Sequence, residues 1–183
     1  MIIKAITKGR GVLLLLLSIM LVLVSCADRG ELESVYTESC FSAELCWILD
    51  GSEYTAHLVA EAPRTDGVGR DIKLEFIAPE ELCGLVVERK NGKVELKRGD
   101  MTVEIHNQAI LKAAELVCAE GKLSYKAKSE ADGRQIIIAA RLCGNESAEI
   151  WLDAESRAPV RIMYGKYDIS VVWFEFSDWE ATK

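Results

Sequence analysis

The sequence has few of the residues from which catalytic and metal sites are built. It contains two histidines, His57 and His106, and no C-x-x-C pair, so it offers no obvious set of zinc ligands. It also lacks the G-x-S-x-G, H-E-x-x-H and phosphate-loop patterns that position a nucleophile, a metal or a nucleotide. We therefore expect a protein that is not an enzyme, with no catalytic residues, no metal and no cofactor.

Basic residues are also in the minority. The chain has 22 Lys and Arg against 29 Asp and Glu, which gives a formal net charge of −7. Three of the basic residues and none of the acidic ones precede residue 26, so the remainder has a net charge of −10. An acidic domain is not drawn by its charge to nucleic acid or to an anionic membrane surface. We expect no nucleic-acid partner.

The first 25 residues have the pattern of a signal peptide. Three basic residues precede an apolar run, 12–24, that only Ser18 interrupts. This run is shorter than the roughly 20 residues that span a bilayer, and small residues precede Cys26, as at a processed signal.

The segment Leu23-Val24-Ser25-Cys26 resembles the lipobox of bacterial lipoproteins. This resemblance implies that residues 1–25 are removed and that Cys26 carries a diacylglyceryl thioether, a double-chain anchor that is sufficient for stable attachment. We expect a lipidated tether over residues 26–39 and a domain over 40–183. The protein would then be lipid-anchored to the extracytoplasmic face of the cell membrane.

Five cysteines follow Cys26, an odd number that leaves at least one unpaired within a single chain. They are Cys40, Cys46, Cys83, Cys118 and Cys143. In an exported protein such residues can form disulfides, whereas in a protein from an anaerobe each can serve as a small buried hydrophobic residue. We favour the second interpretation, and the sequence leaves the disulfide state open.

Alternation of apolar and polar residues dominates from residue 41 onward and predicts about ten short antiparallel strands in sequence order. Asp-Gly and Asn-Gly pairs between them are typical of hairpin turns. The predicted strands cover residues 41–49, 54–60, 72–76, 85–89, 94–97, 101–105, 123–129, 134–142, 149–153, 160–164 and 167–176.

Residues 108–119 depart from this alternation and predict a helix, capped by Asn107 and ended at Gly121. Its apolar side consists of Ile110, Leu111, Ala114, Val117 and Cys118. A meander of so many strands curls, and its concave face needs a cover. The sequence therefore predicts a mainly β fold with one inserted helix, in which a curled antiparallel meander, or half-open barrel, is covered by that helix.

Three segments of this predicted fold are similar to segments of the LolA/LolB-like superfamily of lipoprotein carriers and periplasmic sensors. They are the strand and Pro-Glu-x-Leu turn at 76–85, the hairpin 149–153 with 158–162, and the closing strand 172–179. The resemblance implies a LolA-like fold over residues 40–179. The loop 63–69 departs from the receptor pattern because it is mostly polar, and the long N-terminal helix of the carriers is missing or cut to a turn. Anchored members with short chains, such as the clostridial spore-germination lipoprotein GerS, are also similar, which implies an envelope partner protein.

The large apolar side chains on the predicted concave face can either fill the domain or line a cavity. Trp47, Phe76, Tyr164, Phe174 and Phe176 fall on the predicted inward faces. The candidates for a cavity lining are Trp47, Leu58, Phe76, Ile110, Ala114, Ile162 and Phe174.

The other tryptophans, Trp151, Trp173 and Trp179, alternate toward the outer face. There they can form a contact surface, or Trp151 and Trp173 can form a cross-strand pair. We favour a filled domain, and hence a membrane-anchored, non-catalytic envelope lipoprotein that binds or positions a partner envelope protein. The alternative is a carrier or sensor of acylated or hydrophobic ligands in a concave cavity.

Overall fold

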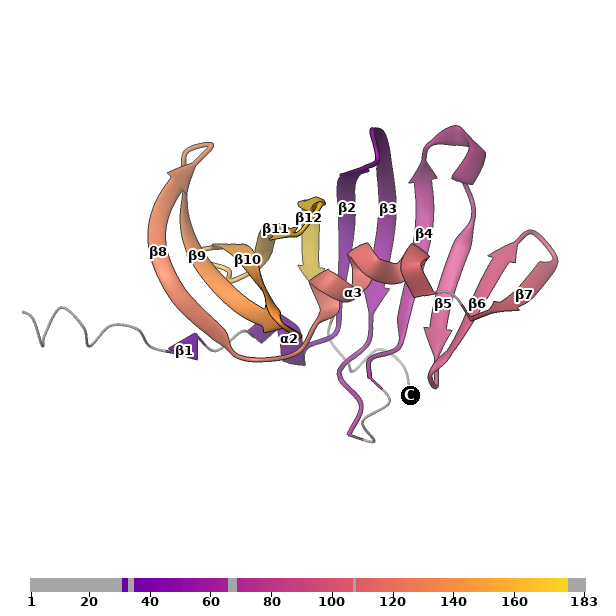
Figure 1. The fold of residues 1–183 in the computed structure, drawn as a ribbon, viewed down its shortest axis with the longest axis horizontal. Helices are drawn as coiled ribbons and strands as arrows, with labels where there is room; N and C mark the ends of the chain where they lie inside the picture. The colour runs from indigo at the N-terminus through magenta and orange to yellow at the C-terminus, as the bar shows by residue number, and fades with distance from the viewer. Residues whose placement is uncertain (1–30, 33–34, 66–68, 107, 178–183) are drawn as a thin grey trace, which may run out of the picture. The chain divides into compact units, whose positions relative to one another are not determined.

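The computed structural model describes residues 31–32, 35–65, 69–106 and 108–177 (Figure 1). The predicted signal peptide, Cys26, the predicted helix cap Asn107 and Trp179 lie outside the described residues. By its internal contacts the chain divides into two units, 1–31 and 32–183. The fold of the second unit contains the candidate sites.

Most of the second unit is β structure. Its strands are β2 (Phe41–Leu49), β3 (Ser52–Ala60), β4 (Ile72–Ala78), β5 (Val86–Lys90), β6 (Lys93–Arg98), β7 (Met101–Ile105), β8 (Leu123–Ala131), β9 (Arg134–Cys143), β10 (Glu146–Asp153), β11 (Pro159–Tyr164) and β12 (Tyr167–Phe176). Its helical segments are α2 (Val35–Glu38), the 3₁₀ turns η1 (Glu80–Leu82) and η2 (Gln108–Leu111), and α3 (Lys112–Cys118). A two-residue strand, β1 (Glu31–Leu32), lies at the boundary between the two units.

The strands β2 to β12 form one open antiparallel sheet in the order β8-β9-β10-β11-β12-β2-β3-β4-β5-β6-β7. This sheet has two halves, β8 to β12 and β2 to β7. Within each half the strands follow sequence order, as predicted. The halves, however, join where β12 pairs with β2 in the middle of the sheet. The expectation of sequence order throughout was therefore wrong, because alternation specifies which face a side chain occupies and not which strands become neighbours. The segment between β7 and β8 has to cross from one edge of the sheet to the other.

The hairpin turns form where the sequence predicts them. Asp50-Gly51 joins β2 to β3 and Asn91-Gly92 joins β5 to β6, with φ values of 52° and 84°, and of 53° and 77°. Two successive residues with positive φ match the right-handed twist of the flanking strands. Asn, Asp and Gly adopt this conformation most readily, which explains why these pairs fix the register of the two hairpins.

The crossing segment contains the helix, and α3 lies across the concave face of the sheet in front of β2, β3 and β4 (Figure 1). Buried side chains of η2 and α3 belong to the same hydrophobic cluster as the inward residues of the strands. They are Leu111, Ala113, Ala114, Leu116, Val117 and Cys118. The predicted mainly β fold, a curled antiparallel sheet covered by one inserted helix, is therefore confirmed.

Within the described part of the chain, no helix is both long enough and apolar enough to span a bilayer.

The five cysteines occupy different environments. All are free thiols; Cys118 is buried, Cys83 is exposed, and the other three are half-buried. Cys83 follows η1, where the chain leaves the sheet, and Cys46 lies on the outward side of β2, where its Sγ is 3.3 Å from Oε1 of Glu53. The interpretation as buried hydrophobic residues therefore holds for Cys118 alone.

Two further details differ from the sequence-based expectation. Phe176, predicted to face inward, is 37% exposed because it lies near the end of β12. Within the predicted tether, residues 35–38 form α2, and Tyr36 of this helix is fully buried in the core. The domain core therefore begins before residue 40.

Candidate functional site

The seven residues proposed as cavity lining all lie in, or pack against, one hydrophobic cluster. Ile110 and Phe174 are half-buried, and the other five are buried. Trp47 shows how this region is filled: its ring stacks on Tyr54 at 5.5 Å and meets the edge of Phe76 at 6.0 Å between ring centroids. The concave face at these residues is occupied by side chains that contact one another.

Aromatic residues also connect α2 to the sheet. The ring of Tyr36 meets Phe41 of β2 and Phe174 of β12 edge-on, each at 6.2 Å, and the last two rings stack at 4.9 Å. This cluster lies at the join between the two halves of the sheet, because Phe41 and Phe174 belong to the paired strands β2 and β12.

Two arginines are buried beside this aromatic cluster. Arg70 is 2% exposed and Arg141 is 1% exposed. Sequence analysis missed both, although a signal was available. Arg141 continues the inward register of Ile137 and Ala139 in β9, and Arg70 precedes the inward Ile72 of β4 by two residues. A charged residue at an inward position of a strand is a candidate for function or for a buried ion pair.

Arg141 connects three segments of the fold. Its Nη2 donates to the carbonyl oxygen of Leu116 at 2.5 Å, and its Nη1 donates to the carbonyl oxygen of Ala119 and to the hydroxyl of Tyr36, the latter at 3.4 Å. Carbonyls at the end of a helix have no partner within the helix and carry its negative partial charge. The side chain of Arg141 therefore attaches the end of α3 to β9 and to α2.

Arg70 makes fewer contacts. Its Nη2 donates to the carbonyl oxygen of Thr37 at 2.5 Å, and its guanidinium lies 5.3 Å from the centroid of the Phe41 ring. Nε and Nη1 of Arg70 are buried without a hydrogen-bond partner, as is Nε of Arg141.

The other titratable groups of this cluster are neutral at pH 7. Burial raises the pKa of the Cys118 thiol from 9.0 to about 11, although Arg70, Arg89 and Arg141 act in the opposite direction. Burial likewise raises the pKa of the Tyr36 hydroxyl against the effect of Arg141. Both guanidinium groups influence both side chains, so Arg70 and Arg141 belong to one electrostatic cluster.

The carboxylate of α3 already has a partner. Oε1 of Glu115 in α3 accepts a hydrogen bond from Nη1 of Arg89 at 2.9 Å, and Nε of Arg89 donates to the carbonyl oxygen of Arg70. We refer to Arg70, Arg141, Tyr36 and Cys118 as the buried arginine cluster.

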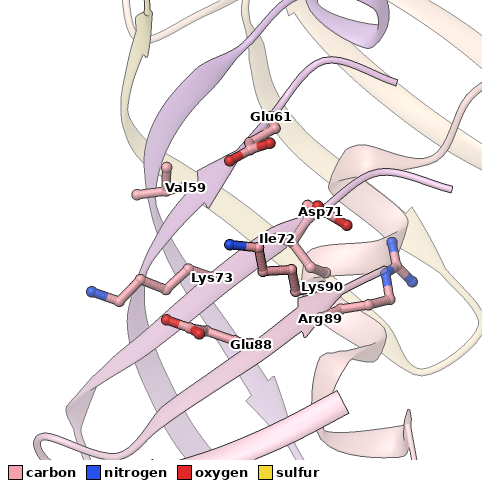
Figure 2. Close-up of a pocket in the computed structure, with 8 residues that line it drawn as sticks. All are labelled: Val59, Glu61, Asp71, Ile72, Lys73, Glu88, Arg89 and Lys90. Carbon is pink, nitrogen blue, oxygen red and sulfur yellow. The ribbon is translucent and has the colours of Figure 1, made fainter. Parts of the chain in front are cut away.

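A separate surface pocket of about 220 Å³ lies where β3, β4 and β5 adjoin (Figure 2). Its lining residues are Val59, Glu61, Asp71, Ile72, Lys73, Glu88, Arg89 and Lys90. Three carboxylates and three cations line it, so the pocket has no excess charge with which to select an ion. Lys73 lies directly opposite Glu88 in the β4–β5 register, as is typical of a solvated sheet face.

A second pocket of about 410 Å³ is lined by residues of β9 to β12 and of the β8–β9 turn, including Trp151 and Arg161. The guanidinium of Arg161 lies 5.3 Å from the Trp151 ring centroid and donates two hydrogen bonds to Asp168, at 2.7 Å and 2.5 Å. Trp151 is therefore paired with Arg161. The alternative of a Trp151–Trp173 pair was wrong, since Trp151 is opposite Arg161 in the sheet and Trp173 is opposite Glu44.

Trp173 instead belongs to an exposed apolar group on β12. A bulge between Val171 and Trp173 interrupts the pairing with β2. Val172 is 63% exposed and Trp173 is 44% exposed, and the Trp173 ring lies 6.1 Å from the His57 ring between centroids. We call Val172 and Trp173 the β12 patch. Among the described residues no group of histidine, cysteine, aspartate and glutamate could hold a metal ion.

The sequence matches no family model and no curated protein. The fold of this chain is similar to those of several solved structures. An uncharacterized conserved protein from Thermus thermophilus matches with a TM-score of 0.52 and 14% identity, over 77% of this chain and 80% of that one. This match shows a shared fold.

Two further solved structures give lower scores. The Pseudomonas aeruginosa MucA/MucB complex matches with a TM-score of 0.45 and 12% identity, over 78% of this chain and 53% of that one, so the chain spans about half of its length. A LolA superfamily protein from Nitrosomonas europaea matches with a TM-score of 0.37 and 7% identity, over 77% and 87% of the two chains.

Proposed function

We propose that this protein is a membrane-anchored, non-catalytic envelope lipoprotein that binds or positions a partner envelope protein. The observation that supports this function is the contrast between the two faces of the sheet. The concave residues that a carrier would use are packed into one cluster with α3, whereas apolar side chains of the β12 patch stand exposed.

The composition of the β12 patch is suited to protein contacts. Tryptophan is enriched at the energetic centres of protein interfaces because its large ring excludes water and its N–H can still find a partner. The bulge in β12 places Val172 and Trp173 consecutively on the exposed surface, where regular alternation would have hidden one of them. A partner that covers both side chains would remove this apolar surface from water.

The carrier alternative has weaker structural support. A ligand in the concave region would have to separate α3 from residues such as Leu58 and Ile162, which are fully buried. It would also have to break the hydrogen bonds from Arg141 to Leu116 and Ala119 at the end of α3.

Co-purification from the native membrane tests the proposed function. The full-length acylated protein would be cross-linked and isolated as wild type, as Trp173→Ser and as Leu142→Ser. The last is a matched control, because Leu142 is 74% exposed but lies on β9, three strands away from β12. We expect the same envelope protein with the wild type and the control, and about tenfold less of it with Trp173→Ser. Isolation of the wild type with an acyl ligand and no protein would contradict the proposal and favour the carrier.

A further inference from the structure

The buried arginine cluster has positive charge, and no carboxylate of the described residues forms an ion pair or a hydrogen bond with Arg70 or Arg141. Guanidinium groups stay protonated at all ordinary pH values, so Arg70 and Arg141 each carry a full charge. The thiol of Cys118 and the hydroxyl of Tyr36 are neutral at pH 7, because burial raises both pKa values. Glu115, the carboxylate of α3, is paired with Arg89.

The partners that the two arginines do have are insufficient to balance these charges. Backbone carbonyls of Thr37, Leu116 and Ala119 supply only partial negative charge. Three N–H donor atoms, Nε and Nη1 of Arg70 and Nε of Arg141, remain buried and unpartnered. Burying a charge that is neither paired nor fully hydrogen-bonded is strongly unfavourable, and orphaned buried donors are rare in folded proteins. The unpaired positive charge and the unpartnered N–H donors together point to a ligand that is negatively charged and accepts hydrogen bonds.

We propose that the buried arginine cluster binds a carboxylate beneath α3, with Arg70 and Arg141 as its donors. A planar guanidinium matches the two oxygens of a carboxylate. The backbone carbonyl oxygens that accept hydrogen bonds from the two guanidinium groups would repel a doubly charged phosphate more strongly than a singly charged carboxylate. The site goes beyond the proposed partner binding, because it lies in the core whereas the β12 patch lies on the surface.

The carboxylate belongs either to a small free anion or to a fatty acid, whose chain would have to displace side chains of the filled core. Binding of ¹³C-labelled acetate and decanoate to the full-length protein in a non-ionic detergent, followed by NMR at constant ionic strength, distinguishes these sources. Phosphate serves as the competing anion. We expect saturable binding of a carboxylate to the wild type. If the ligand is a fatty acid, decanoate should bind at least tenfold more tightly than acetate. If it is a small anion, the two should bind with equal affinity.

Variants locate the binding at the cluster. Arg70→Met should weaken carboxylate binding at least tenfold, whereas Arg161→Met should leave it unchanged, because Arg161 is paired with Asp168 on the surface. Arg70→Lys keeps the charge without the planar fork and should be intermediate, which provides a second test if Arg70→Met does not fold. Absence of saturable binding to the wild type would overturn the proposal. So would equal binding by Arg70→Lys and the wild type, or phosphate binding as tight as that of acetate.

Discussion

At the scale of single residues, Arg141 connects segments that are far apart in the sequence. It extends from β9 to the last carbonyls of α3 and to Tyr36 of α2. Its hydrogen bonds explain how a helix of seven residues, too short to be stable alone, keeps a fixed position on the sheet. The buried thiol of Cys118 at the end of that helix belongs to the same cluster.

Cys118 gives a prediction about pH. Its pKa is raised from 9.0 to about 11 in the folded protein, so the folded state holds this proton more tightly than the unfolded state does. The associated stability is fully present below pH 9 and is lost as the pH rises toward 11. We expect the free energy of unfolding to fall by up to about 3 kcal/mol more in the wild type than in Cys118→Ala over this interval. Urea unfolding between pH 8 and pH 11 measures it, and parallel pH curves for the two proteins would refute the assignment.

Cys26 gives a prediction about anchoring. Cys26→Ala removes the atom to which the diacylglyceryl group would attach, so the variant should remain unprocessed or unacylated and leave the detergent phase in a phase-partition assay. Ser25→Ala, which keeps a small residue before the cysteine, should partition like the wild type. Normal processing and partition of Cys26→Ala would show that this protein is not a lipoprotein.

The residue-level features that the sequence revealed were those with a local cause. The inward positions of Trp47 and Phe76 follow from alternation along one strand, and the turn at Asn91-Gly92 follows from the conformations open to those two residues. The buried arginine cluster could not be predicted in the same way. Its members come from α2, α3, β9 and the loop that precedes β4, and only the folded chain brings them together.

At the scale of elements, η2 and α3 together cover the concave face, and the burial of η2 can be tested with a matched pair of substitutions. Leu111→Asp places a carboxylate at a fully buried position, whereas Leu142→Asp makes the same change at a position that is 74% exposed. We expect Leu111→Asp to cost at least about 3 kcal/mol or to prevent folding, and Leu142→Asp to cost no more than about 1 kcal/mol. Ile110→Asp, at a half-buried position, should fall between them. Similar unfolding midpoints for all three variants would mean that η2, the turn that leads into α3, does not pack on the sheet.

The existence of most elements was predictable, whereas their arrangement was not. The strand from 41 to 49 and the helix from 108 to 119 agree with β2 and with η2 plus α3, since each has a clear period. The pairing of β2 with β12 involves residues more than one hundred positions apart, and no local pattern specifies it. The burial of α2 was missed because the few apolar residues of this mostly polar segment, such as Leu32 and Tyr36, follow no clear period.

At the scale of the whole molecule, the β2–β12 pair makes the two halves of the sheet depend on each other. We therefore expect one cooperative unfolding transition for the second unit. Leu74→Ala in β4 and Ile150→Ala in β10 each remove a fully buried side chain from a different half and should each cost about 2–5 kcal/mol.

Both variants should lower a single urea midpoint that is the same by circular dichroism and by tryptophan fluorescence. Two transitions, only one of which moves with each variant, would show that the halves fold independently and that the β2–β12 pair does not couple them.

The central claim about this protein is that a filled domain, held by a lipid anchor, presents an apolar patch to a partner. Native mass spectrometry of the full-length protein, isolated from its own membrane in detergent, tests this claim most directly. We predict a complex whose mass equals the chain from Cys26 onward, a covalent diacylglyceryl group and one partner protein, and we predict that Trp173→Ser loses the partner. A chain that carries a second, non-covalent acyl lipid and no protein would contradict the claim.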